Sequence, residues 1–295
     1  MKQIRLGSRE SRLAVIQAEL VRDALQRVHP DWDVIIKTYK TMGDKILDRP
    51  LDKIGGKGLF TKELELELLS GEIDLIVHSL KDVPMQVDAR IPIVGVMTRE
   101  DERDALVLPK GENALDLGKL IGCSSKRRAL QLRALYPGCM VAPVRGNVLT
   151  RLEKLDSGQF GALVLAAAGL KRLSLEGRIT RLFSPEEMLP AACQGVLALQ
   201  ARAEFDRSVL LGVCDEQAHK LALAERSFVR MLDGGCSSPV AAHAVQAGEE
   251  VTLTGLYVEE DGETLHFDRI TGPLREAEAL GRTLAVSMKE TWGAK

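Results

Sequence analysis

Short apolar runs alternate with amphipathic helical patterns through the first two thirds of the chain, and this alternation limits the possible fold most. The runs are rich in β-branched residues, and the stretches between them repeat at the helical period, which is typical of α/β architecture. We expect strands over residues 3–6, 34–39, 73–78, 93–98, 105–108, 120–122, 140–143 and 162–166. We expect helices over residues 12–28, 61–69, 126–135 and 148–155, with Ser11 and Thr61 as N-caps and Gly71 as a C-terminal stop.

The pattern changes at two places. The charged run REDERDA, residues 99–105, separates one strand–helix series from the next. After a long helix expected over residues 216–232, consecutive strands follow over 241–245, 251–258 and 264–270, and then a final helix over 273–289. A chain of 295 residues is long enough for two or three domains. We therefore predict two α/β domains followed by a small α+β C-terminal domain.

Charge and cysteine content exclude several classes of protein. The 40 Lys and Arg residues are balanced by 42 Asp and Glu residues, so no global basic field favours nucleic acid. The start, MKQIRLGSRE, has no apolar signal region, and no apolar run approaches the length of about 18 residues that a membrane span needs. None of the five cysteines forms a CxxC pair, and the histidines show no metal spacing. We expect a cytoplasmic protein with reduced thiols, no metal and no membrane partner.

Arginines gather where expected strands give way to helices. Serines and helix-start amides at several of these junctions also favour anions, so the set could form a carboxylate or phosphate site. The alternative is that each arginine pairs with a surface acid. The arginines are Arg9, Arg12, Arg127, Arg128, Arg145, Arg151 and Arg172.

Three further segments could carry chemistry. HSLKDVP, residues 78–84, leads from an apolar strand to Lys81 and Asp82, which are either solvated or aimed at a ligand. GGKGLFTKE, residues 55–63, lacks P-loop spacing, so it is either a mobile segment that brings Lys57 over a site or a plain surface loop. GGCSSP, residues 234–239, holds Cys236 in a glycine turn where a thiolate would be accessible. Cys139 and Cys214, by contrast, are expected to be buried apolar side chains.

Seven segments together resemble the hydroxymethylbilane synthase (porphobilinogen deaminase) family in order and approximate spacing. They are GSRESRLAVIQAE, GGKGLFTKELE, HSLKDVP, SSKRRALQL, RGNVLTRL, AAAGLKRL and GGCSSP. The resemblance implies a monomeric transferase of tetrapyrrole (heme) biosynthesis, which condenses four porphobilinogen molecules head to tail with release of ammonia and hydrolyses the product to hydroxymethylbilane. It implies a dipyrromethane primer bound through a thioether to Cys236, with Asp82 as the catalytic residue.

The resemblance also implies a fold. Two domains like those of periplasmic binding proteins would enclose a central cleft, and a small α+β domain would present the cofactor cysteine. On this basis domain 1 comprises residues 1–99 and 196–213, domain 2 residues 100–195, and domain 3 residues 214–295.

Motif matches assign residues to two groups. Each pyrrole carries an acetate and a propionate, which suit planar arginine forks. Cofactor binding is implied for Cys236, Lys81, Asp82, Ser125, Arg127, Arg128, Arg145 and Lys57. Substrate binding is implied for Arg9, Ser11, Gln17, Arg151, Arg172, Phe60, Lys53 and Gln194, with Phe60 stacking on a pyrrole.

Three residues depart from the family pattern. Cys123 stands where threonine is frequent, Cys193 where glycine is usual, and Gln200 where glutamate is usual. Two alternatives of other classes remain at this point: a non-catalytic anion-binding protein, and a regulatory ligand-binding module on DNA. The first gives Asp82 and Cys236 no role, and the second lacks a helix-turn-helix pattern and a basic stripe.

Overall fold

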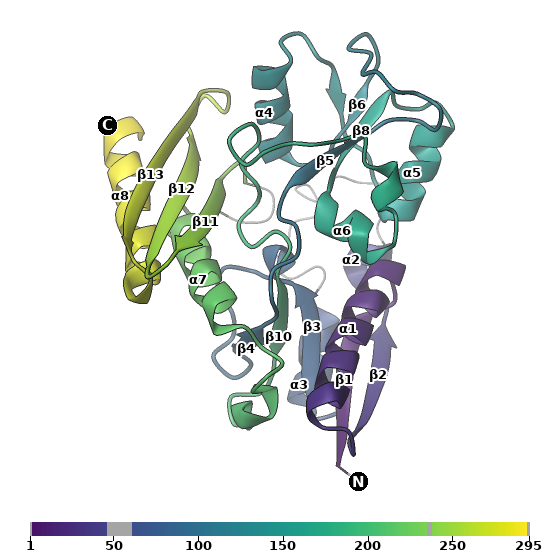
Figure 1. The fold of residues 1–295 in the computed structure, drawn as a ribbon, viewed down its shortest axis with the longest axis vertical. Coiled ribbons are helices and arrows are strands. Elements are labelled where there is room, and N and C mark those ends of the chain that lie inside the picture. Colours follow the sequence, from purple (N-terminus) through teal and green to yellow (C-terminus); the bar gives the residue numbers. More distant parts are fainter. Residues whose placement is uncertain (1, 46–60, 235–237, 294–295) are drawn as a thin grey trace. The chain divides into compact units, whose positions relative to one another are not determined.

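The computed structural model describes residues 2–45, 61–234 and 238–293. The chain forms two compact units, which Figure 1 shows as ribbons. The first unit comprises Met1–Glu100 and Val196–His219, and the second comprises Asp101–Gly195 and Lys220–Lys295. The division into three domains stays a prediction. No helix in the described part of the chain has both the length and the apolar character that crossing a membrane requires.

A five-stranded sheet forms the centre of the first unit, in the order β2-β1-β3-β10-β4. Strands β1, β2 and β3 are parallel neighbours, whereas β10 runs antiparallel between β3 and β4. The strands are β1 (Gln3–Arg9), β2 (Asp33–Tyr39), β3 (Leu75–Ser79), β4 (Ile93–Val96) and β10 (Leu197–Gln200). A late segment of the chain therefore completes the sheet that the N-terminal segment begins.

Both faces of this sheet are covered. Leu75 and Val77 of β3 belong to the core that includes Leu25 of α1 (Arg12–Val28), while Ile76 points to the opposite core with Leu68 of α3 (Lys62–Leu69). This explains why β3 reads as a continuous apolar run, as is usual for strands buried on both faces. The short α2 (Met42–Lys45) and the 3₁₀ turns η2 (Leu80–Asp82) and η4 (Arg207–Leu210) complete the unit.

A second five-stranded sheet, in the order β7-β6-β8-β5-β9, has helices α4 and α5 in separate cores. Leu106 and Val164 pack with Leu132 of α4, whereas Val107 and Leu165 share a core with α5. The strands are β5 (Asp104–Val107), β6 (Ile121–Gly122), β7 (Val141–Ala142), β8 (Ala162–Ala166) and β9 (Arg181–Leu182). The helices are α4 (Lys126–Leu135), α5 (Val148–Asp156), α6 (Ala167–Arg172) and the 3₁₀ turn η3 (Glu176–Arg178).

The C-terminal part is a three-stranded antiparallel sheet with two helices. Its elements are α7 (Glu216–Met231), β11 (Ala241–Ala247), β12 (Glu250–Val258), β13 (Leu265–Pro273), the 3₁₀ turn η5 (Leu274–Glu276) and α8 (Ala277–Trp292). Helices α7 and α8 touch at Gly281, where an added Cβ would lie 2.2 Å from the carbonyl oxygen of Ala224. The Ser227 hydroxyl donates a hydrogen bond to the Glu278 carbonyl at 2.8 Å. A glycine is required at this crossing because the two backbones meet there.

The predicted α/β class with a C-terminal α+β part is confirmed. Helices α1 and α4 have the expected bounds, and Ser11 caps α1 as predicted, with its Oγ accepting from the Ala14 amide at 3.4 Å. Thr61 is the N-cap residue of α3, as predicted, but its side chain makes no capping hydrogen bond. The last helix begins at residue 277 instead of 273, because β13 continues to Pro273 and η5 follows. Strand β9 and helix α6 were not expected.

Candidate functional site

The exit from β3 is a rigid turn that exposes one carboxylate. The strand ends at Ser79, and residues 80–82 form the single 3₁₀ turn η2. Leu80 and Val83 are buried, and the Leu80 amide donates to the Val196 carbonyl at 2.9 Å. Asp82 is exposed and Lys81 half-buried between these anchors. The backbone of the turn is therefore held by the core, and Asp82 is exposed on it.

Other predicted residues of the first unit lie at the same edge of its sheet. Strands β1 and β3 are parallel neighbours, so the end of β1, at Arg9, lies beside the end of β3. The Gln17 amide of α1 donates to the Ser79 hydroxyl at 3.0 Å, which joins the first helix to the β3 exit. Ser11, as the N-cap of α1, lies at this edge too. The structure thus brings Arg9, Ser11, Gln17, Lys81 and Asp82 to one edge.

His78, on β3 four residues before Asp82, is fully enclosed. Its Nε2 donates to the Gln200 Oε1 at 2.9 Å, and the Gln200 amide donates to the Ile91 carbonyl at 2.8 Å. Burial lowers the pKa of His78 to about 4, and the hydrogen bond with Gln200 and the charge of Asp82 only partly oppose this effect. The imidazole is therefore neutral near neutral pH.

The low pKa of His78 predicts a loss of stability in mild acid. In the unfolded chain a histidine titrates near pH 6.5, so between about pH 6.5 and pH 4 only the unfolded state takes up this proton. We expect His78 to reduce the free energy of unfolding by about 3 kcal/mol over that interval. Urea unfolding at a series of pH values, compared with that of His78→Asn, measures this share.

The variant should show a shallower pH dependence than the original chain. Gln200→Glu is the matched control, because a carboxylate beside the imidazole favours its charged form and raises the pKa of His78. Equal slopes for the original chain and His78→Asn would contradict the assignment.

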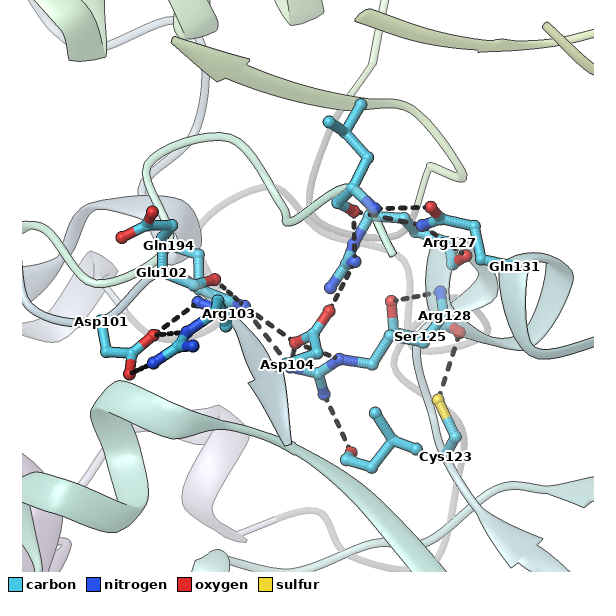
Figure 2. Close-up of polar contacts among 12 residues, drawn as sticks. Asp101, Glu102, Arg103, Asp104, Cys123, Ser125, Arg127, Arg128, Gln131 and Gln194 are labelled. Atoms are coloured by element: carbon cyan, nitrogen blue, oxygen red, sulfur yellow. Dashed lines mark hydrogen bonds and ion pairs between the residues drawn. The ribbon is translucent and has the colours of Figure 1, made fainter. Parts of the chain in front are cut away.

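The second unit contains two buried arginines that share one carboxylate (Figure 2). Arg127 and Arg128, in the first turn of α4, are 3% and 8% exposed, and Asp104 is 0% exposed. Arg127 Nη1 donates to Asp104 Oδ2 at 2.7 Å, and Arg128 Nε donates to Oδ1 at 2.9 Å. Arg127 Nη1 also donates to the Leu189 carbonyl at 2.7 Å. The predicted anion-binding arginines are therefore assembled around an internal acid.

Two glutamines and a serine support this cluster. Gln194 donates to Asp104 Oδ1 at 2.8 Å and accepts from Arg128 Nη2 at 3.3 Å. Gln131 binds the backbone of Leu189, and Ser125 caps α4. Burial alone would raise the pKa of Asp104, but the charges and hydrogen bonds of Arg127 and Arg128 together hold this pKa well below its usual value.

Two further predicted arginines of this unit, Arg151 and Arg172, donate hydrogen bonds to backbone carbonyls. Arg151 Nε donates to the Gly146 carbonyl at 2.8 Å, and Arg172 Nη2 donates to the Gly195 carbonyl at 2.6 Å. Gly146 has φ +111 and leads into α5, whose N-cap is Asn147. The Arg145 carbonyl accepts from Lys154 Nζ at 3.1 Å. The segment RGNVLT thus forms a tight helix entry that carries Arg145 and Arg151.

The three departures from the family pattern are all buried. The Cys123 thiol donates to the Ser125 carbonyl at 3.4 Å, and burial raises its pKa, which disfavours a reactive thiolate. Cys193 has φ +61, a conformation that favours glycine, which explains why the family usually has glycine there. Its amide donates to Glu225 Oε2 at 2.5 Å. Gln200 is the partner of His78. Cys139 is buried, as expected, and Cys214 is only partly buried.

Four predicted site residues lie outside the described residues: Lys53, Lys57, Phe60 and Cys236. In the part of the chain that is described, no group of three or more His, Cys, Asp or Glu side chains could hold a metal ion. Sequence reasoning missed Asp104 and Gln131. An aspartate at the start of an apolar strand was the available signal for Asp104, but the run REDERDA was interpreted only as a boundary.

Comparison with family models gives two matches that together cover most of the chain. The model described as "Porphobilinogen deaminase, dipyromethane cofactor binding domain" matches residues 4–209. The model described as "Porphobilinogen deaminase, C-terminal domain" matches residues 219–290.

Curated relatives match over nearly their whole length. A porphobilinogen deaminase of Acetivibrio thermocellus is 55% identical over 97% of this chain and 98% of its own length. One of Synechococcus elongatus is 44% identical over 100% of this chain and 94% of its own length. Among solved structures, the periplasmic aliphatic sulphonate binding protein SsuA from Escherichia coli is 13% identical, with a TM-score of 0.44 over 99% of this chain and 93% of that one. That match carries no argument about function.

Proposed function

The chain belongs to the porphobilinogen deaminase family, and from that premise we propose which residues bind the cofactor, bind the substrate and catalyse the reaction. The enzyme is a transferase that joins four porphobilinogen molecules head to tail on a dipyrromethane cofactor, with release of ammonia, and hydrolyses the product to hydroxymethylbilane. The family decides against the two alternatives raised by the sequence, an anion-binding protein without catalysis and a regulatory module on DNA.

The donor groups of this chain suit the chemistry of the cofactor. Each pyrrole ring carries two carboxylates, and arginine forks bind carboxylates in a bidentate and permanently charged manner. Arg127 and Arg128 form such a cluster with Ser125 and Gln194, and this buried cationic cluster is the observation that carries the proposal. When bound, the dipyrromethane supplies the pyrrole carbon to which the first porphobilinogen is joined. We assign its attachment to Cys236.

Asp82 is the proposed catalytic residue. Departure of ammonia from porphobilinogen leaves positive charge on the pyrrole, and a proton must leave after the new carbon–carbon bond has formed. A fixed carboxylate can stabilise this charge and accept or return a proton. The anchored turn after β3 supports this role, because Leu80 and Val83 are buried while Asp82 is exposed. Lys81 and Arg145, together with Lys57, are proposed to hold cofactor carboxylates.

Substrate carboxylates are assigned to polar groups of both units. Arg9, Ser11 and Gln17 share the strand edge that carries Asp82, which supports their part in the first unit. Arg151, Arg172 and Gln194 are the proposed contacts in the second unit. Lys53 and Phe60 complete the proposed set. We also propose a monomeric, cytoplasmic enzyme, and the free thiols of the four described cysteines support a reducing compartment.

The intact mass of the purified protein tests the proposal. We expect a mass excess equal to one dipyrromethane, located on the peptide that contains Cys236, because the cofactor is attached through a thioether. Addition of porphobilinogen should extend the adduct in steps of one pyrrole unit. Folded protein with an unmodified mass that does not change with porphobilinogen would refute the proposed attachment and elongation.

A further inference from the structure

The arginine cluster is only partly neutralised from within. Arg127 and Arg128 contribute two positive charges and Asp104 one negative charge, so the three groups keep a net charge of plus one. All three side chains are nearly excluded from water. Arginine does not lose its proton, so this residual charge persists over the whole working range of pH. A net positive charge held among buried groups favours a ligand group of opposite sign.

Asp104 is held where it can fix both guanidinium groups. It is the first residue of β5 and pairs in register with Ala166 of β8, so its backbone belongs to the central sheet. Oδ2 accepts from Arg127, while Oδ1 accepts from Arg128 and Gln194. Rotation of the carboxylate would break these bonds together. Figure 2 shows the carboxylate between the two guanidinium groups.

We propose that Asp104 is the positioning residue of the arginine pair: it fixes the two guanidinium groups and lowers their charge so that they select a single carboxylate of the cofactor over a free divalent anion. This inference rests on the proposed function of the site. Without Asp104 the pair would carry two positive charges, which suits a dianion such as sulfate better than one acetate or propionate group.

Asp104→Asn tests the inference because asparagine keeps the shape and removes the charge. We expect most of the purified variant to lack the dipyrromethane by intact mass, whereas the original chain carries it. We also expect sodium sulfate to raise the melting temperature of the variant more than that of the original chain, at an ionic strength matched with sodium chloride. Asp156→Asn is the matched control. It removes the partner of Arg178 in the same unit and should resemble the original chain in both measurements.

Asp104→Glu separates position from charge. Glutamate keeps the negative charge but moves the carboxylate by about one bond length, so we expect reduced cofactor content with no added response to sulfate. Full cofactor content in Asp104→Asn, or in Asp104→Glu if the asparagine variant does not fold, would overturn the positioning role. Equal sulfate responses of Asp104→Asn and the original chain would overturn the selection by charge. If the original chain is folded but carries no dipyrromethane, the proposed function is refuted. In that case the sulfate responses of the original chain and Asp104→Asn would still test whether Asp104 sets the charge selectivity of the arginine pair.

Discussion

Asp82→Asn should leave the protein folded and loaded with its dipyrromethane, yet slow the formation of hydroxymethylbilane by a factor of about 10²–10⁴. The amide has nearly the shape of the carboxylate but neither its charge nor its basicity. Since Asp82 is exposed on a turn held by Leu80 and Val83, the substitution should leave the turn intact. Product formation per loaded molecule, with loading taken from the intact mass, measures the effect.

Asp88→Asn is the control for this substitution. Asp88 is an exposed aspartate that follows the same turn, and its carboxylate pairs with Arg90 at 2.6 Å. An ion pair on the surface contributes little to stability, so this variant should form product at the normal rate. Near-normal turnover in Asp82→Asn would remove Asp82 from the mechanism.

Arg128→Leu should damage both stability and cofactor loading. It removes the Nε and Nη2 contacts to Asp104 and leaves that buried carboxylate with a single charged partner. Breaking a buried pair in this way costs about 3–5 kcal/mol. Urea unfolding measures the stability, and intact mass measures the fraction that carries the dipyrromethane. Arg127→Leu should behave in the same way, because its guanidinium also contacts Asp104.

Two further variants, Arg128→Lys and Arg178→Leu, separate the loss of stability from the loss of cofactor loading. Lysine keeps the charge but lacks the planar fork, so Arg128→Lys should retain more stability than Arg128→Leu while still loading poorly. Arg178 pairs with Asp156 near the surface, and its loss should cost about 1 kcal/mol or less without any effect on loading. Normal loading and product formation in Arg128→Leu would contradict the role of the arginine pair.

Local patterns in the sequence were sufficient for the helices that frame the site. Helices α1 and α4 each begin after a serine N-cap, and both were predicted with their observed bounds. Strand β10 and its place in the sheet could not be predicted from local sequence patterns. Its four residues are all buried and show no alternation, and its partners β3 and β4 lie far away in the chain. Pairing with strands that are distant in the sequence determines that these residues form a strand, as is often the case in sheets.

The candidate site shows the same division between local and distant information. A cluster of arginines at helix starts predicted an anion site, because helix amides and arginine favour anions wherever the helix lies. Asp104 could not be recognised as their partner, since it lies 23 residues before Arg127 and the two meet only when β5 packs beside α4. The buried arrangement of His78 with Gln200 likewise depends on strand pairing, over a separation of 122 residues.

Strand β10 also affects the order in which the chain can fold during synthesis. Among the described strands, β4 pairs only with β10, and β10 begins about a hundred residues after β4 ends. At synthesis rates of about 5–20 residues per second, the edges of β3 and β4 that pair with β10 stay unpaired for roughly 5–20 s during synthesis. During that interval the segment that forms β5–β9 is complete, so the second sheet can close before the first one. Unpaired strand edges promote association between chains, and a nascent chain of this protein is therefore most exposed to aggregation before residue 200 is added.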